Sequence, residues 1–353
     1  MASDRTHDPL HLDFELPDPD RRFAGVRLWT DAELGHYPPP VDFTREGRVW
    51  HLRLETPPID RLEYQFVARL KDDAGEEYVL DPENERTVGG AFGDKSERVL
   101  PGYRRPHWLE HEPVAAQRHD YALETDAGPV ELQVWSPEVL AADEEAPLLL
   151  AHDGPEFDEL AGLTRAVGVA IAHRRLAPTR VALLRPGPRD ERYAANDDYA
   201  AALATQVVPE IAAAHPTSGS PVLLGASLGG LAALHAHWRH PGTFGGLFLA
   251  SASFFTPKLD PQEANFSRFA QVTDFVREVA ETREDAAAVR ELPPVAIVCG
   301  TAEENLANNM AMRQVLTAWR PPTWHTVRDG HCYTTWRDLL DPTLVDLLAR
   351  AAP

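Results

Sequence analysis

One serine in this sequence stands in a pattern that could make it a nucleophile. Residues 222–230 read VLLGASLGG, in which an apolar run leads into G-x-S-x-G, and residues 231–237 continue as helix formers. A sharp strand-to-helix turn needs small residues on either side of the serine, and the flanking glycines supply them. Such a turn would lift the Ser227 hydroxyl clear of the sheet and place the Leu228 N–H at a helix start, where it could donate to a developing oxyanion. The pattern predicts acyl transfer to Ser227; a Gly-rich turn that only joins a strand to a helix is the alternative interpretation.

A serine hydroxyl is a weak nucleophile, so it needs a base within hydrogen-bond reach and an acid that orients the base. In proteins with this serine turn, the acid follows along the chain and the histidine comes last. His331 fits the base, because an alternating run at residues 324–328 and an Asp-Gly turn would deliver it to the carboxyl edge of a sheet. A structural or surface role is favoured for the other histidines near these elements, which are His235, His237, His240 and His325.

The acid is expected just after the apolar run at residues 295–298, where the sequence continues CGTAEEN. Either glutamate of this segment could reach the base. Glu303 is favoured and Glu304 is the alternative. A charge at a helix N-terminus is the expected role of whichever glutamate is not used.

The strands and helices that would position these residues are predicted from the part of the chain after about residue 113. Short apolar runs alternate there with helical segments, and the runs are at residues 130–135, 148–151, 181–184, 222–224, 247–250 and 295–298. This alternation predicts a mostly parallel sheet covered on both faces by helices. Residues 196–214 predict an amphipathic helix, since apolar residues recur there every four positions. Residues 256–292 are too long for a simple loop and predict a helical cap whose aromatics pack it onto the sheet.

The first part of the chain has a different pattern. Apolar residues alternate with polar ones between about residues 24 and 70, and prolines interrupt the runs at short intervals. This predicts a small antiparallel sandwich. A proline-rich, charged stretch at residues 101–113 is typical of a domain connection, so we predict one domain over residues 1–112 and a second over residues 113–353.

Composition limits the partners and the location. The chain has 34 basic and 55 acidic side chains, a formal net charge of −21 that repels nucleic acid and anionic lipid. Two cysteines among 353 residues indicate no disulfide scaffold. Residues 1–9 lack the pattern of a secretory signal, and no apolar run approaches the ~18 residues that would span a bilayer. We therefore expect a cytoplasmic protein without nucleic-acid or membrane partners, and a homo-oligomer is compatible with the sequence.

These motifs together resemble the enterochelin-esterase-like branch of the esterase D group of α/β-hydrolases. The resemblance spans about residues 148–340. It is carried by Asp153-Gly154 after a strand, the Gly225 to Gly230 turn, Gly300-x-x-Glu303 followed by Asn308 or Asn309, Asp329-Gly330-His331, and Trp336-Arg337. The segments Val26-Arg27-Leu28-Trp29, Asp81-Pro82 and Leu100-Pro101-Gly102-Tyr103 are similar to the immunoglobulin-like domain that precedes such esterases. The implied fold is an α/β-hydrolase sheet preceded by an all-β immunoglobulin-like sandwich.

The resemblance also implies roles for individual residues. Ser227, Glu303 and His331 would be the catalytic triad, and the Asp153-Gly154 loop would supply the second oxyanion donor. Residue 155 is a proline without an N–H, so the donor would be Gly154 or Glu156. Substrate contacts are expected from Asp153, Arg189 and Arg192, and a local basic pocket could include Arg185 together with these two arginines. Arg192 stands where relatives tend to carry glutamate, which places a salt bridge of the family in doubt.

The expected activity is hydrolysis of a small-molecule ester through an acyl-enzyme, with a siderophore trilactone as one candidate substrate. This mechanism requires no metal and no cofactor. Ferric catecholate complexes are anions, whereas this chain is strongly acidic. Two alternatives remain open: a non-catalytic protein that binds a glycan or a partner on a hydrolase scaffold, and an acyltransferase that shares the acyl-enzyme.

Overall fold

The computed structural model describes residues 11–33, 41–71 and 74–352. Residues 1–9, from which we expected no secretory leader, lie outside these ranges. The chain divides into two compact units. Unit 1 comprises Met1–Arg104 together with two short later segments, Thr301–Glu303 and Arg328–Cys332, and unit 2 comprises the remainder. The domain boundary expected at residue 112 stays a prediction.

Unit 1 is built from two antiparallel sheets. The first has the strand order β1-β4-β3, and the second has the order β2-β5-β8-β7 with β6 paired to β5. The strands are β1 His11–Pro17, β2 Phe23–Thr30, β3 Thr44–Glu46, β4 Val49–Glu55, β5 Arg61–Leu70, β6 Glu76–Val79, β7 Thr87–Val88 and β8 Lys95–Val99. The period-two pattern predicted strands at the sites of β2, β4 and β5, and the all-β character of this region is confirmed.

The core of unit 1 explains this local structure. Alternate residues of β1, which are Leu12, Phe14 and Leu16, are each at most 3% exposed. The ring of Phe14 packs edge-on against those of Tyr64 and Phe66 from β5, with ring centroids 5.1 and 6.1 Å apart. Alternation buries one face of each strand, which is the physical basis of the period-two signal.

Unit 2 contains one eight-stranded sheet with the order β16-β15-β14-β13-β11-β12-β10-β9. All neighbouring strands from β12 to β16 pair in parallel, while β10 pairs antiparallel with β12 and with β9. The strands are β9 Ala116–Leu123, β10 Val130–Pro137, β11 Leu148–Ala151, β12 Arg180–Leu184, β13 Val222–Ala226, β14 Gly246–Ala250, β15 Val295–Gly300 and β16 Thr323–Val327. Because parallel strands end at one edge of a sheet, the residues after β11, β13, β14, β15 and β16 leave the sheet on the same side.

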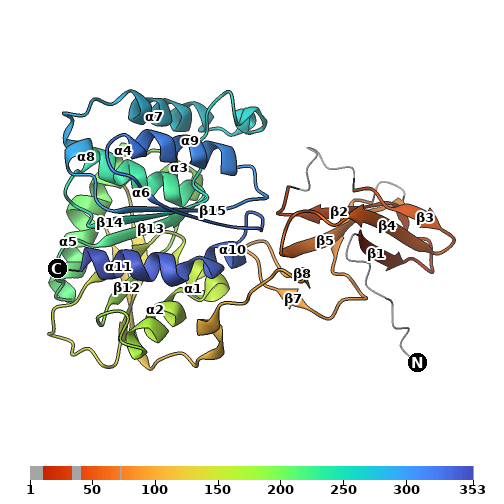
Figure 1. The fold of residues 1–353 in the computed structure, drawn as a ribbon, viewed down its shortest axis with the longest axis horizontal. Helices are drawn as coiled ribbons and strands as arrows, with labels where there is room; N and C mark the ends of the chain where they lie inside the picture. The colour runs from red at the N-terminus through yellow and green to blue at the C-terminus, as the bar shows by residue number, and fades with distance from the viewer. Residues whose placement is uncertain (1–10, 34–40, 72–73, 353) are drawn as a thin grey trace. The chain divides into compact units, whose positions relative to one another are not determined.

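Helices cover both faces of this sheet (Figure 1). On one face lie α3, α4, α6, α7, α8 and α9, and on the other lie α1, α2, α10 and α11. The helices are α1 Gly154–Ala161, α2 Leu163–Ala172, α3 Arg189–Tyr193, α4 Asp197–Ala202, α5 Val208–Ala214, α6 Leu228–Arg239, α7 Phe269–Glu281, α8 Ala287–Arg290, α9 Leu306–Thr317, α10 Tyr333–Asp338 and α11 Val345–Ala351. Unit 2 also contains the short 3-10 helices η2 His107–Glu110 and η4 Pro261–Asn265. The π-helical segments η3 Leu203–Val207 and η5 Leu340–Leu344 directly precede α5 and α11. This is the α/β-hydrolase arrangement that the sequence predicted.

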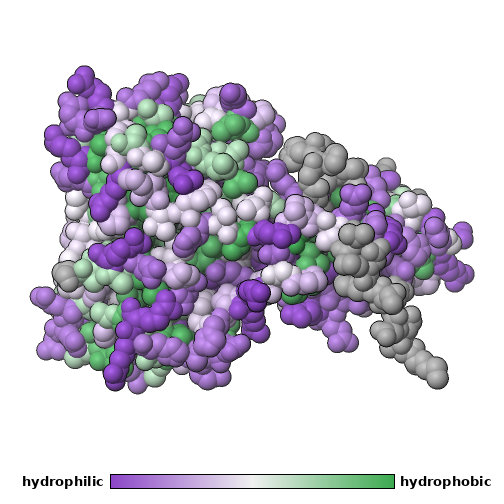
Figure 2. Space-filling model, viewed as in Figure 1, coloured by the Kyte–Doolittle hydropathy of each residue, from purple (hydrophilic) through white to green (hydrophobic). Residues whose placement is uncertain are grey.

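Buried side chains form separate cores on the two faces of the sheet in unit 2. The strands β11, β12, β13, β14 and β15 are buried along their whole length, so both of their faces contribute. Hydrophilic side chains cover much of the visible surface, with hydrophobic residues in small patches between them (Figure 2). None of the helices in the described part of the chain combines the length and the apolar character that a membrane span requires.

Candidate active site

The predicted nucleophile lies on a strained turn between β13 and α6 in unit 2. Ser227 has φ 54° and ψ −127°, a conformation that side chains other than glycine rarely adopt. The turn is tight because β13 runs directly against the first turn of α6. A Cβ built on Gly225 would lie 2.1 Å from the carbonyl oxygen of Gly229. Gly225 is therefore required by sterics, and a Cβ on Gly229 would be tight, at 3.2 Å from the Cβ of His152.

Two neighbouring segments hold this turn in place. The Ser227 N–H donates to the carbonyl of Ala250 at the end of β14, at 2.9 Å. The Ser253 N–H donates to the Ser227 carbonyl at 3.0 Å, and the Oγ atoms of the two serines are 3.2 Å apart. The Asn309 side chain secures the same loop, since it accepts from the Ala252 N–H at 3.2 Å and donates to the Ala252 carbonyl at 2.7 Å. Sequence reasoning missed Ser253; its signal was a Ser-Ala-Ser run directly after the strand next to that of the nucleophile.

The predicted oxyanion loop also lies beside this turn. It follows β11, and α1 begins with Gly154 and carries Pro155 in its first turn. His152, buried completely, is hydrogen-bonded through Nδ1 to the Gly229 carbonyl at 3.0 Å, which ties the loop to the start of α6. Burial lowers the pKa of His152 to about 4, so its ring is neutral near pH 7 and Nδ1 is the donor. The N–H groups of Gly154 and Glu156 belong to a first helical turn, whose N–H groups have no carbonyl partner inside their own helix.

An ion pair fixes the side chain at the head of this loop. Asp153 has a left-handed φ of 49°, and its carboxylate accepts two hydrogen bonds from Arg189, both at 2.9 Å. The Tyr193 hydroxyl accepts the Asp153 N–H at 3.2 Å. Arg192 is 6% exposed, and its guanidinium donates to the backbone carbonyls of Pro129 and Pro186. Of the two arginines predicted to contact substrate, Arg189 is therefore held at this loop and Arg192 at two backbone carbonyls outside it, so both already have protein partners.

A cavity of about 580 Å³ opens next to the first turn of α1. Its volume lies within the range of pockets that take small molecules. Charged residues of both signs line it, together with several prolines. The charged residues are Glu131, Glu156, Arg185 and Arg192.

The predicted base and acid are hydrogen-bonded to each other in unit 1. Nδ1 of His331 lies 2.5 Å from Oε2 of Glu303, whose side chain is fully buried. The His331 side chain is 24% exposed, which leaves part of the ring accessible. Glu304 is half-buried. Of the two glutamates left open by the sequence, Glu303 is the one placed to orient the imidazole.

Three of the other four candidate histidines, His235, His237 and His325, have partners for their side chains, and His240 caps the C-terminal end of α6 through its backbone N–H. In unit 2, His235 pairs with Asp197 at 3.0 Å, and His237 bonds to the carbonyl of Ala288 at 2.8 Å. Nδ1 of His325 lies 2.5 Å from the Thr343 hydroxyl. Burial lowers the pKa of both His235 and His237, so these rings are neutral near pH 7.

The segment predicted as a cap is helical. It contains η4, α7 and α8, and α7 buries Val272, Phe275, Val276 and Val279 against the sheet-covering core. Phe266 and Phe269 pack partly buried against the same core. The aromatics therefore serve packing, as expected.

Comparison with known protein families shows that the chain belongs to an esterase family. The family model described as "Putative esterase" matches residues 126–347, which is more than half of the chain. A comparison with curated protein sequences found no match.

Solved structures share the fold. The enterobactin esterase FES from Shigella flexneri, determined in the presence of enterobactin, has a TM-score of 0.74 at 19% identity over 96% of this chain and 92% of that one. The ferric enterobactin esterase from Salmonella typhimurium has a TM-score of 0.77 at 21% identity over 96% and 93%. A ferulic acid esterase matches 67% of this chain and 99% of its own at 19% identity, with a TM-score of 0.56.

Proposed function

We propose, on the premise that this chain belongs to the esterase family, that it cleaves a small-molecule ester by a serine mechanism. The chain is a carboxylic ester hydrolase. The proposal concerns the residues that carry out the reaction and the substrate. Ser227 is the nucleophile, His331 the general base and Glu303 the residue that orients the base.

The observation that carries the proposal is the backbone of Ser227. A non-glycine residue at φ 54° is costly, by about 1–3 kcal/mol, and persists where the surroundings impose it. Here the strand β13, the helix α6 and the hydrogen bond to Ala250 impose it. A strand, a strained serine and a helix in this order are the features of a nucleophile elbow.

The reaction follows from the chemistry of these groups. The Ser227 oxygen bonds to the carbonyl carbon of the ester while its proton passes to Nε2 of His331. The negative charge on the former carbonyl oxygen is stabilised by the N–H of Leu228 and by that of Gly154 or Glu156. The C–O bond then breaks, and the leaving alcohol takes the proton from His331. Water repeats the two steps on the acyl-enzyme, which releases the acid and restores the serine.

The fold likeness to enterobactin esterases makes a siderophore trilactone our candidate substrate. The cavity beside α1 has a volume in the range of small-molecule pockets, and it is lined by Glu156, one of the two candidates for the second oxyanion donor. A panel of esters that includes a trilactone siderophore, free and iron-loaded, tests this by product mass. Cleavage of simple acyl esters but not of the trilactone would leave the esterase proposal and remove the siderophore.

Covalent labelling tests the nucleophile. A fluorophosphonate should label the wild-type protein and not Ser227→Ala, and hydrolysis of p-nitrophenyl acetate by that variant should fall by about 10³-fold or more. Ser253→Ala is the matched control, because its hydroxyl lies 3.2 Å from that of Ser227 but should still leave the protein labelled. Wild-type rates in Ser227→Ala would refute the mechanism, and a labelled Ser227→Ala with an unlabelled Ser253→Ala would assign the reaction to Ser253.

A further inference from the structure

Unit 1 holds a cluster of buried charges around the segment that carries His331. Arg61 is completely buried, and its guanidinium contacts Glu63 at 2.6 Å and also Asp329, two residues before His331. The Lys95 ammonium contacts Asp31 and lies 3.2 Å from the second oxygen of Glu63. The five side chains form one continuous chain of ion pairs, Asp31–Lys95–Glu63–Arg61–Asp329, which we name the charge cluster.

The residues of the charge cluster accept hydrogen bonds from the backbone of His331 and of Gly330 just before it. The His331 N–H donates to the Asp31 carbonyl at 3.0 Å, and the Gly330 N–H donates to the Asp329 carboxylate at 2.8 Å. A Cβ built on Gly330 would lie 2.5 Å from the Asp31 carbonyl oxygen, so the two segments approach as closely as a glycine allows. The position of His331 is therefore coupled to that of Asp31.

The segment that carries Glu303 is joined to the same structure. The Ala302 N–H donates to the Asp329 carbonyl at 3.0 Å, and the Glu33 N–H donates to the Ala302 carbonyl at 2.8 Å. The Ala302 side chain is 8% exposed and belongs to the hydrophobic core of unit 1. Base and acid thus share one hydrogen-bonded framework.

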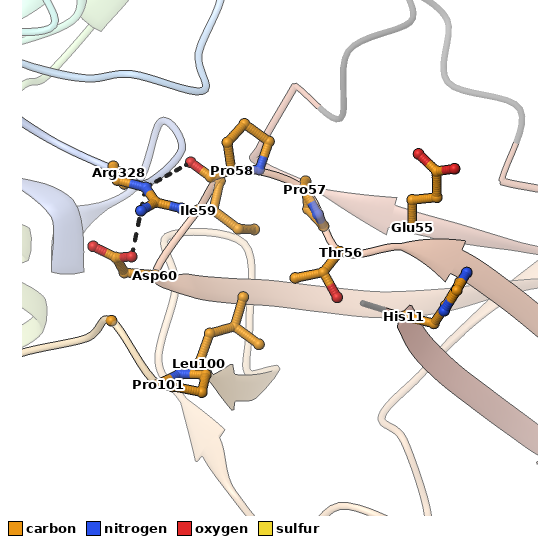
Figure 3. Close-up of a pocket in the computed structure, with 11 residues that line it drawn as sticks. His11, Glu55, Thr56, Pro57, Pro58, Ile59, Asp60, Leu100, Pro101 and Arg328 are labelled. Atoms are coloured by element: carbon orange, nitrogen blue, oxygen red, sulfur yellow. Dashed lines mark hydrogen bonds and ion pairs between the residues drawn. The ribbon is translucent and has the colours of Figure 1, made fainter. Parts of the chain in front are cut away.

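The start of β5 holds the segment from its other end. The Asp60 N–H donates to the Arg328 carbonyl at 2.7 Å. The Arg328 side chain returns to the same turn: its Nε donates to the Pro58 carbonyl at 3.0 Å and lies 3.6 Å from the Asp60 carboxylate (Figure 3). Arg328 forms one wall of a cavity of about 520 Å³, which is lined by residues of this region, among them Ile59 and Leu100.

We propose that Arg61 and Lys95 are positioning residues for the base, so that the all-β region forms part of the catalytic apparatus. The argument rests on the proposed role of His331. Burying each of these charges costs free energy of desolvation, so stability alone does not account for the ion pairs. The pairs link strands β5 and β8 to Asp31 and Asp329, which hold the backbone around His331. An imidazole must be held to within a fraction of an ångström of its working position, and a shift of about 1 Å can cost about 10²-fold in rate.

Lys95→Met tests the positioning role. This substitution removes the cation that joins Asp31 to Glu63, so we expect kcat on p-nitrophenyl acetate to fall about tenfold or more while KM changes less than about threefold. Arg98→Met is the matched control: Arg98 lies on the same strand, its guanidinium stacks on Phe14 and it lies 3.9 Å from Asp81. Its kcat should stay within about twofold of wild type. A folded Lys95→Met with wild-type kcat, or an equal loss in Arg98→Met, would overturn the proposal.

A second variant keeps the inference testable if Lys95→Met does not fold. Asp31→Asn keeps the backbone carbonyl that holds His331 and removes the negative charge that acts on the imidazole. The other charged or titratable groups of unit 1 around the histidine segment stay unchanged; these are Glu303, Asp329, Arg61, Lys95, Glu63 and Cys332. Loss of the negative charge disfavours the imidazolium, so the acid limb of kcat/KM should move to lower pH by about half a unit or more. An unchanged profile would contradict the coupling.

NMR titration of the His331 ring separates this inference from the proposed function. The ring signal should titrate at lower pH in Asp31→Asn than in wild type, whether or not the protein cleaves esters. If wild type is not labelled by a fluorophosphonate, the serine mechanism fails while the NMR comparison still decides the coupling. If wild type is labelled and Asp31→Asn titrates like wild type, the mechanism stands and the charge cluster has no influence on the histidine.

Discussion

The hydrogen bond between His331 and Glu303 determines what the imidazole can do. A histidine can act as a base only if its accepting nitrogen faces the nucleophile, and a partner on Nδ1 fixes that tautomer. Glu303 is buried and only 2.5 Å from Nδ1, so its carboxylate selects the tautomer with the proton on that nitrogen. In the proposed mechanism, the same carboxylate would stabilise the imidazolium that forms when His331 takes the serine proton.

Glu303→Gln should therefore lower kcat strongly without a large change in fold. The glutamine preserves the shape of the side chain but can present its amide N–H₂ to Nδ1, which stabilises the wrong tautomer. We expect kcat on p-nitrophenyl acetate to fall by about 10²–10⁴-fold, measured by initial rates. Glu304→Gln is the control and should remain within about threefold. If the two variants lose activity equally, the carboxylate that orients the base is not Glu303 alone.

The sequence pointed to candidate residues where a residue type and its local context carry the signal. Ser227 was proposed from the glycines around it, and its φ of 54° on a strand-to-helix turn fits that pattern; His331 and Glu303 were proposed from their places after strands and are hydrogen-bonded to each other, while their catalytic roles stay predictions. Lys95 carries no such local signal, and the Ser-Ala-Ser run that contains Ser253 does not by itself indicate a contact with Ser227. Their importance comes from partners that are distant in the chain, such as Asp31 for Lys95, and no pattern of spacing encodes these contacts.

At the level of elements, the turn between β13 and α6 stores strain that its neighbours must balance. Strand β13 is buried along its whole length, and α6 buries almost every residue. The turn cannot relax outward without separating these two elements. A change that enlarges the turn should therefore affect both stability and activity.

Gly225→Ala makes this change. The added Cβ would meet the carbonyl oxygen and carbon of Gly229 at 2.1 and 2.3 Å, which are backbone atoms that cannot rotate away. We expect the free energy of unfolding to fall by about 2–4 kcal/mol, measured by urea denaturation, together with loss of esterase activity. Gly25→Ala on β2 is the control, because its Cβ would lie 3.5 Å from the flexible end of Arg69, and its cost should stay below about 1 kcal/mol. Equal stabilities of the two variants would show that the turn is not sterically closed.

The elements that sequence predicted best are those buried on both faces. The runs at β11 and β15 are continuously apolar because neither face meets water. The edge strand β9 was missed: most of its residues are exposed, and its sequence AQRHDYAL is mainly polar. The strand β1 was also missed: its alternation of apolar and polar residues covers only seven positions and stands between Pro9 and Pro17.

The charge of the whole molecule acts on substrates over a longer range than any of these contacts. A formal net charge of −21 creates a negative potential that repels anionic esters. Arginines near the first turn of α1 could oppose it, but they have partners of their own. Arg189 is paired with Asp153 at 2.9 Å, and Arg185 lies 3.6 Å from Glu131. We therefore expect the field of the whole molecule to prevail over the local one.

The dependence of kcat/KM on salt tests which field prevails. Raising the ionic strength from about 0.01 M to about 0.15 M shortens the screening length from about 30 Å to about 8 Å, which weakens long-range repulsion. For a p-nitrophenyl ester with a terminal carboxylate, kcat/KM should then rise about two- to threefold, because more substrate reaches the site. For neutral p-nitrophenyl acetate it should stay within about 20%, which controls for effects of salt on the chemistry itself. A fall with salt for the anionic ester alone would mean that the arginines beside α1 attract it despite their partners, and would strengthen the case for an anionic natural substrate.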